Sequence, residues 1–155
     1  MPLPGPGEAF FLVPQCAQEL SLGWYGDDLV PVLRPISDRS PSQRWTGTFT
    51  LNAPIYDNPA ATGILWWGYD FDKVLALGQP NTPAIVKAGV EANGTDIGSW
   101  NLSTFGEFFG FQYFLNTDQN LNVAGDGPYP AGTSILGWSW GGGAPNELWK
   151  FVPFD

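Results

Sequence analysis

The sequence predicts an all-β protein whose twelve short strands form three similar units of four strands. Twenty glycines and fifteen prolines among 155 residues supply turn-forming residues along the whole chain, and such residues commonly separate short strands. Between the turns, apolar and polar residues alternate with the period of two that is typical of strands with one buried face. Three tryptophans, Trp45, Trp100 and Trp149, end segments of similar length. Together these observations predict repeated β-structure.

The repeat is mainly one of spacing. An apolar residue, a variable residue and a second apolar residue precede each tryptophan, at Leu20–Leu22, Leu75–Leu77 and Leu121–Val123. The distance from the first of these residues to the tryptophan is 25, 25 and 28 residues, and the tryptophans lie 55 and 49 residues apart. Such internal repeats indicate structural modules of one kind. We expect a single domain, 1–155, with units at about 9–50, 62–104 and 110–154.

Each unit contains four segments with strand character. The expected strands are 9–14, 19–24, 29–35 and 43–49 in the first unit, 63–69, 73–78, 84–89 and 99–103 in the second, and 110–116, 120–125, 133–140 and 148–154 in the third. Turn-rich stretches such as "YGDDL", "GQPNTP" and "GDGPYPAG" separate them. Twelve strands of this kind close into a barrel with a cap of hairpins, which is a β-trefoil. Closure removes exposed strand edges, which in so apolar a β protein would favour aggregation.

Composition excludes several classes of function. The net charge is −9, with six basic against fifteen acidic residues, so nucleic acid and anionic membranes are not expected partners, because phosphate binding needs clustered Lys or Arg. No histidine is present, which excludes histidine-based triads and metal sites. The carboxylates of "YDFD" at Tyr69–Asp72 fit an exposed hairpin better than a Ca²⁺ site. We therefore expect no enzyme activity, no cofactor and no metal.

The ends of the chain and its single cysteine bear on its location. No basic segment followed by an apolar one opens the sequence, so no signal peptide is visible and a cytoplasmic location is expected, although a mature secreted chain would look the same. Cys16 has no partner for an internal disulfide, and we expect it to be a small buried apolar residue. No apolar run approaches the roughly 18 residues of a membrane helix.

The pattern "LNV…GTSILGW…NELWKF" of residues 121–151 resembles the repeat of the ricin B-type β-trefoil lectins. That repeat has an L-D-V triplet, a G-T strand and a terminal Q-x-W motif, and the absence of disulfides is similar to the fungal cytoplasmic lectins of this type. The resemblance implies that Trp45, Trp100 and Trp149 lie in the core. It implies the same for the apolar triplet residues Leu20, Leu22, Leu75, Leu77, Leu121 and Val123.

The resemblance also implies a carbohydrate site in the third unit. The family's pocket uses the middle residue of the triplet, here Asn122, an aromatic residue at the end of the third strand, here Trp138, and an amide before the last tryptophan, here Asn146. Asp126 and Tyr129 lie in the loop expected to overhang this pocket. A flat indole covers the apolar face of a sugar, while amides and carboxylates pair with its hydroxyls. Asn122 replaces the family's aspartate, and Glu147 its glutamine.

The other two units differ from this pattern. In the first, Ser21 is the middle residue of the triplet and Arg34 takes the aromatic position. The loop "GWYGDD" there, with Trp24, Tyr25, Asp27 and Asp28, is a candidate second site of different construction. In the second unit, Ala76 and the strand "IVKAG" offer neither an acid nor an aromatic residue, so no pocket is expected.

The predicted function is that of a lectin, which binds glycans or glycoproteins chiefly through its third unit. Single shallow sugar sites are weak, about −4 kcal/mol, so a second site or a homodimer would add avidity. A β-trefoil protease inhibitor is the alternative, because the proline-containing connection 52–63 has the length of an inhibitory loop. A structural or toxin-associated protein without a small ligand is a third interpretation.

Overall fold

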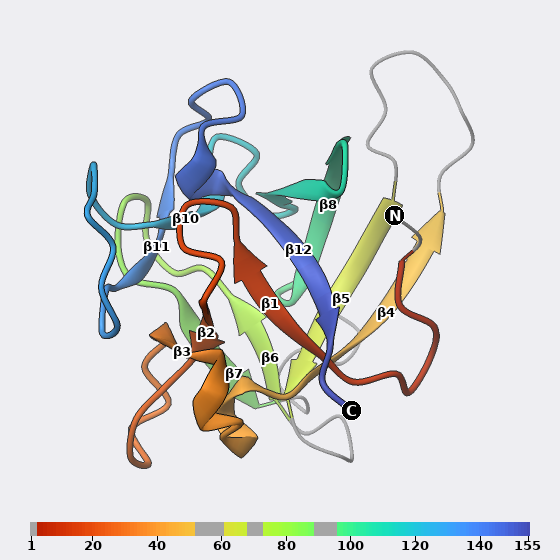
Figure 1. Cartoon of the computed structure of the whole chain (residues 1–155). Helices are drawn as coiled ribbons and strands as arrows, with labels where there is room; N and C mark the ends of the chain where they lie inside the picture. Colours follow the sequence, from red (N-terminus) through yellow and green to blue (C-terminus); the bar gives the residue numbers. More distant parts are fainter. Residues whose placement is uncertain (1–2, 52–60, 68–72, 89–95) are drawn as a thin grey trace.

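In the computed structural model of this protein, which describes residues 3–51, 61–67, 73–88 and 96–155, four strands follow one another in each of three units (Figure 1). The strands are β1 (Phe10–Pro14), β2 (Leu20–Gly23), β3 (Val32–Pro35), β4 (Trp45–Leu51), β5 (Ala61–Trp67), β6 (Lys73–Ala76), β7 (Ile85–Ala88), β8 (Ser99–Phe105), β9 (Phe108–Tyr113), β10 (Asn120–Val123), β11 (Ile135–Trp138) and β12 (Leu148–Pro153). Three short 3-10 helices lie at Ile36–Asp38 (η1), Pro41–Gln43 (η2) and Pro145–Glu147 (η3). All twelve expected strands overlap an observed one. No helix in the described residues has the length and apolarity needed to cross a bilayer.

The first and fourth strands of the three units form a closed barrel. β1 pairs with β4, β4 with β5, β5 with β8, β8 with β9 and β9 with β12. β12 then returns to pair with β1, from Phe10 opposite Pro153 to Pro14 opposite Trp149. All six pairs are antiparallel. Because the ring of hydrogen bonds closes on itself, none of these six strands presents a free edge.

The second and third strands of each unit form hairpins outside the barrel: β2 with β3, β6 with β7, and β10 with β11. The hairpins also touch one another. Val32 bridges to Ser134 in one such contact, and Pro83 bridges to Leu136 in another. A six-stranded barrel with three hairpins is the arrangement expected of a β-trefoil.

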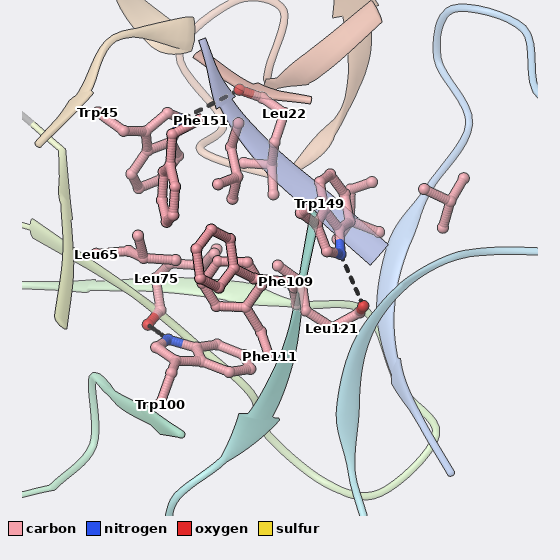
Figure 2. Packing of buried hydrophobic residues seen from close by; sticks show 14 of the residues in the cluster. Leu22, Trp45, Leu65, Leu75, Trp100, Phe109, Phe111, Leu121, Trp149 and Phe151 are labelled. Carbon is pink, nitrogen blue, oxygen red and sulfur yellow. Dashed lines mark hydrogen bonds between the residues drawn. The ribbon is translucent and has the colours of Figure 1, made fainter. Parts of the chain in front are cut away.

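Three tryptophans make the same contact in the core. Trp45, Trp100 and Trp149 are fully buried, and the indole N–H of each donates to a backbone carbonyl, of Leu22 at 3.1 Å, Leu75 at 3.2 Å and Leu121 at 2.9 Å respectively. Figure 2 shows these three bonds around the apolar residues of the barrel interior. The predicted core positions of the tryptophans and of the apolar triplet residues are thereby confirmed.

The indole bonds correct the expected alignment of the first unit. They equate Leu22, not Leu20, with Leu75 and Leu121, so the first triplet is Leu22–Trp24. The hairpin contacts agree, because Val32, opposite Gly23, takes the place of Leu136, opposite Asn122. The equivalent of Asn122 is therefore Gly23 and not Ser21, whereas Arg34 keeps its predicted equivalence with Trp138. A strand of period two looks the same after a shift of two residues, which explains the error.

Candidate functional site

A hollow of about 270 Å³ lies beside the hairpin β10–β11 of the third unit. Its lining comprises Asn122, Val123, Ala124, Gly125, Asp126, Leu136, Trp138 and Asn146. Four of the five predicted site residues are thus brought together from three segments of the chain: β10 with the loop that follows it, the end of β11, and η3. Leu136 and the backbone of 123–125 complete the wall.

Trp138 supplies the aromatic surface of this hollow. It is the last residue of β11, opposite Asn120 in the register, while Leu136 lies opposite Asn122. Residues opposite one another in an antiparallel pair project to the same face, so the hairpin presents an indole, a leucine and two amides on one side. Trp138 is 49% exposed. An indole that is half in contact with solvent offers a free apolar surface beside polar groups.

Two asparagines line the hollow, and the amide nitrogen of each donates to backbone carbonyls of the protein. Asn146 donates from Nδ2 to the carbonyl of Val123 at 3.0 Å. This bond fixes η3 against the loop, and within the described residues no hydrogen bond reaches Oδ1 of Asn146. Asn122 is only 4% exposed, and its amide nitrogen, turned toward the backbone, donates to the carbonyls of Leu121 at 3.3 Å and Asn120 at 3.1 Å. The two amides are therefore held rigidly, and their oxygens remain to accept hydrogen bonds.

Asp126 and Tyr129 have different places in the loop after β10. Asp126 is exposed, lines the hollow and accepts no hydrogen bond from the described residues. Tyr129 does not line the hollow. Its hydroxyl donates to the carbonyl of Gly125 at 3.0 Å, and its ring packs against the core. Burial, followed by the charges of Cys16 and Asp126, raises the pKa of Tyr129 above its usual range. Tyr129 thus braces the loop that carries Asp126.

Glu147 has a structural role that the sequence analysis missed. Its carboxylate is 1% exposed and accepts hydrogen bonds from the backbone N–H groups of Gly141 at 2.9 and 3.0 Å, Gly143 at 2.8 Å and Ala144 at 2.9 Å. A buried carboxylate needs such partners. The acid therefore pins loop 139–144, which follows Trp138, to η3, which carries Asn146. In the sequence, the only indication of this role was the position of Glu147, shortly after the three consecutive glycines 141–143.

A second hollow, of about 450 Å³, lies between the first two units. It is lined by Trp24, Gly26, Asp27, Leu29, Arg34, Ser40, Pro41, Ser42, Trp67 and Lys73, and we call it the first-unit hollow. Its position within the first unit corresponds to that of the third-unit hollow. Ser42 donates to the carbonyl of Trp24 at 2.8 Å, just as Asn146 donates to Val123.

The loops of the two hollows match residue by residue. Trp24, Gly26 and Asp27 take the places of Val123, Gly125 and Asp126, and both glycines have positive φ, 66° and 90°. This left-handed backbone suits glycine and turns the following aspartate toward the hollow in both units. Arg34 stands where Trp138 stands. At Gly23, the equivalent of Asn122, an added Cβ would lie 2.8 Å from Cγ of Gln43, so that glutamine occupies the space of the missing side chain.

The four residues predicted for the second site are not equally placed. Trp24 is 3% exposed and belongs to the core, in edge contacts with Trp45 and Trp67, so it forms only the floor of the hollow. Trp24 occupies the inward position of the triplet Leu22–Trp24. Asp27 lines the hollow. Tyr25 lies under the Arg34 guanidinium at 4.6 Å from the ring centroid, and Asp28 accepts from the N–H of Val30.

The remaining predicted features are less informative. In the second unit, Ala76, Lys87 and Ile97 occupy the places of Asn122, Trp138 and Asn146, and the expected lack of a pocket there stays a prediction. Cys16 is half-buried rather than buried, and burial raises the pKa of its thiol to about 11. Most of the proposed inhibitory loop, residues 52–60, lies outside the described residues, and residues 61–63 belong to β5. The whole "YDFD" segment, Tyr69–Asp72, also lies outside the described residues. Among the described residues no three His, Cys, Asp or Glu side chains are grouped to hold a metal ion.

No protein-family model matches the chain, and no curated protein matches it in sequence. Solved structures match it in fold. ThreeFoil, a designed threefold-symmetric protein, is 17% identical with a TM-score of 0.70 over 93% of this chain and 97% of its own. The ricin B-like lectin of Macrolepiota procera, solved in complex with lactose, is 18% identical with a TM-score of 0.67 over 98% and 99%. A mosquitocidal holotoxin is 16% identical with a TM-score of 0.74, over 96% of this chain and 17% of its own.

The similar structures therefore include a ricin B-like lectin, and the resemblance predicted from the sequence is confirmed in the fold. The match to the Macrolepiota lectin spans nearly the full length of both chains, so it concerns the barrel and all three hairpins. In the holotoxin, the same fold forms a minor part of a much longer protein.

Proposed function

We propose that this protein is a carbohydrate-binding lectin whose principal site is the third-unit hollow. The observation that carries the proposal is the meeting of the half-exposed indole of Trp138 with Asn122, Asp126 and Asn146 around one hollow. The indole covers the apolar C–H face of a pyranose. The carboxylate of Asp126 and the oxygen of Asn146 accept hydrogen bonds from its hydroxyls.

The size and rigidity of the hollow favour one sugar residue over a larger ligand. Its volume, about 270 Å³, is slightly smaller than the roughly 300–1,000 Å³ of most small-molecule sites. Asn146 and the loop after Trp138 are held in place before any ligand arrives, through the bonds of Asn146 to Val123 and of Glu147 to the loop. Groups that are already ordered lose little conformational entropy on binding. We expect affinities near the millimolar range for a monosaccharide, about −4 kcal/mol.

The proposal is one of binding and not of catalysis. The site holds a single exposed carboxylate, Asp126, whereas glycoside hydrolysis uses a pair of carboxyl groups on either side of the scissile bond. Glu147 is not available as its partner, because its oxygens are engaged by three backbone N–H groups. A homodimer would bring two such sites together and raise the avidity.

Titration of lactose by calorimetry, followed by a glycan array, tests this proposal; lactose is the first ligand because the similar Macrolepiota lectin was solved with it. Trp138→Ala should weaken binding of any glycan that the wild type binds by about tenfold or more, from the loss of roughly 1.5 kcal/mol of aromatic contact. Trp140→Ala is the matched control, since Trp140 is also exposed, two residues further on, and does not line the hollow. Undiminished binding by Trp138→Ala would disprove the site.

A further inference from the structure

The first-unit hollow differs from the third-unit hollow in its charge. The cations of Arg34, at the end of β3, and Lys73, at the start of β6, both line it, together with the carboxylate of Asp27. The chain has only six basic residues against fifteen acidic ones, so two of the six border one hollow. We propose that this hollow binds an acidic saccharide, whose carboxylate is held by Arg34 and Lys73.

Arg34 is already oriented for such a ligand. Its Nε donates to Asp38 at 2.9 Å, and its Nη1 donates to the carbonyl of Trp24 at 2.8 Å. The guanidinium carbon lies 4.6 Å from the centroid of the Tyr25 ring. An arginine has five N–H donors, and within the described residues these two bonds leave three, on Nη1 and Nη2. Two of them, one on each nitrogen, form the fork that pairs with both oxygens of a carboxylate.

The other walls favour a saccharide over a bare anion. Trp67, whose ring is held by a 2.7 Å bond from its indole N–H to the carbonyl of Pro41, supplies apolar surface, and Nζ of Lys73 lies 5.3 Å from the centroid of that ring. The carboxylate of Asp27 accepts hydrogen bonds from hydroxyl groups, which a saccharide supplies. Asp38, on the Nε side of Arg34, offsets part of the positive charge. The preferred ligand therefore has a carboxylate, hydroxyls and an apolar ring face.

The repeat gives an independent reason for the assignment. Arg34 stands where the third unit has Trp138, and Asp27 where it has Asp126, so the two hollows are variants of one site. Exchange of an indole for a guanidinium replaces contact with a sugar face by pairing with a sugar carboxylate. The choice of a saccharide rests on the proposed function, whereas the preference for an acid rests on Arg34 and Lys73 alone.

Calorimetry with a galacturonic acid trisaccharide and with its methyl ester, which lacks the negative charges, tests the preference. Both titrations use the Trp138→Ala protein, so that the third-unit hollow contributes little. We expect the acid to bind about tenfold more tightly than the ester. Binding of the acid should weaken as salt is raised, because ions screen the pairing. Inorganic phosphate at the same concentration should not displace the acid.

Three variants with the same change of charge locate the site. Arg34→Gln and Lys73→Gln should each weaken binding of the acid by about tenfold, while Lys87→Gln should not change it, because Lys87 lies at the Arg34 position of the second unit. A melting curve of each variant verifies folding. If Arg34→Gln unfolds because it loses the bonds to Asp38 and to the carbonyl of Trp24, Lys73→Gln alone still tests the site. Equal binding of acid and ester, displacement by phosphate, or identical behaviour of all three variants would overturn the inference. Failure of lactose binding in the earlier test would leave these outcomes unaffected.

Discussion

Replacement of Glu147 by alanine tests the role of a buried acid in positioning the third-unit hollow. The substitution removes the acceptor of three backbone N–H groups, those of Gly141, Gly143 and Ala144. A hydrogen bond to a charged group contributes roughly 1.5–3 kcal/mol. Gly141 is exposed and the other two are partly so, hence water replaces much of the loss. We expect Glu147→Ala to lower the free energy of unfolding by about 3 kcal/mol, and the melting temperature by about 6–12 °C.

Glu147→Gln should be milder, at about 1–2 kcal/mol, because one acceptor oxygen remains. The first unit shows this state: Gln43, at the equivalent position, accepts from the N–H of Ser40 at 2.8 Å. Urea unfolding followed by circular dichroism measures the change, and amide hydrogen exchange at Gly141 and Gly143 reports the loop directly. Glu107→Ala is the matched control, since this exposed acid makes only a 4.0 Å ion pair with Lys150. If Glu147→Ala and Glu107→Ala differed by less than about 0.5 kcal/mol, the reasoning would be refuted.

Two further predictions concern the core and the single cysteine. Phenylalanine in place of Trp45, Trp100 or Trp149 should lower the free energy of unfolding by a similar amount, about 2–4 kcal/mol, because each variant loses one hydrogen bond to a buried carbonyl and part of a buried ring. Urea unfolding measures the change in each variant. A variant as stable as the wild type would contradict the equivalence of the three tryptophans. Burial raises the pKa of the Cys16 thiol to about 11. The thiol therefore keeps its proton to a higher pH in the folded chain than in the unfolded chain. Its contribution to stability is therefore complete below about pH 8.5 and disappears as the pH rises through about 11. In denaturation at stepped pH, Cys16→Ala should show a shallower alkaline loss than the wild type, and an identical profile would contradict the shift.

The strand pattern was predictable because period-two alternation and turn residues are local signals. The spacing of Trp45, Trp100 and Trp149 predicted the three units, and each of these indoles makes the same bond to a backbone carbonyl. The alignment of the first triplet was not predictable, since a shift by two residues preserves the alternation. The bond from Trp45 to Leu22 and the bridges between the hairpins distinguish the two alignments.

The candidate site was predictable in its third-unit side chains and not in its support. Trp138, Asn122 and Asn146 follow from a motif, but the bracing by Glu147 depends on a loop that folds back onto η3. The first-unit hollow could not be predicted from the sequence, for a different reason. Its cations come from β3 and β6, which belong to different units, and the sequence alone did not bring Arg34 and Lys73 together. The cytoplasmic location and the homodimer stay predictions.

The pairing of β1 with β12 has a consequence for biosynthesis. These strands, the first and the last of the twelve, seal the ring (Figure 1), so the seam cannot form until β12 has left the ribosome. Contacts between such distant segments slow folding, and until the last strand arrives β1 and β9 each have an unsatisfied side. Deletion of residues 148–155 should therefore convert a sealed cylinder into an open sheet that recruits other copies of itself. Joining residues 3 and 155 through a linker and opening the chain elsewhere should instead preserve the seam, since β1 and β12 are neighbouring strands.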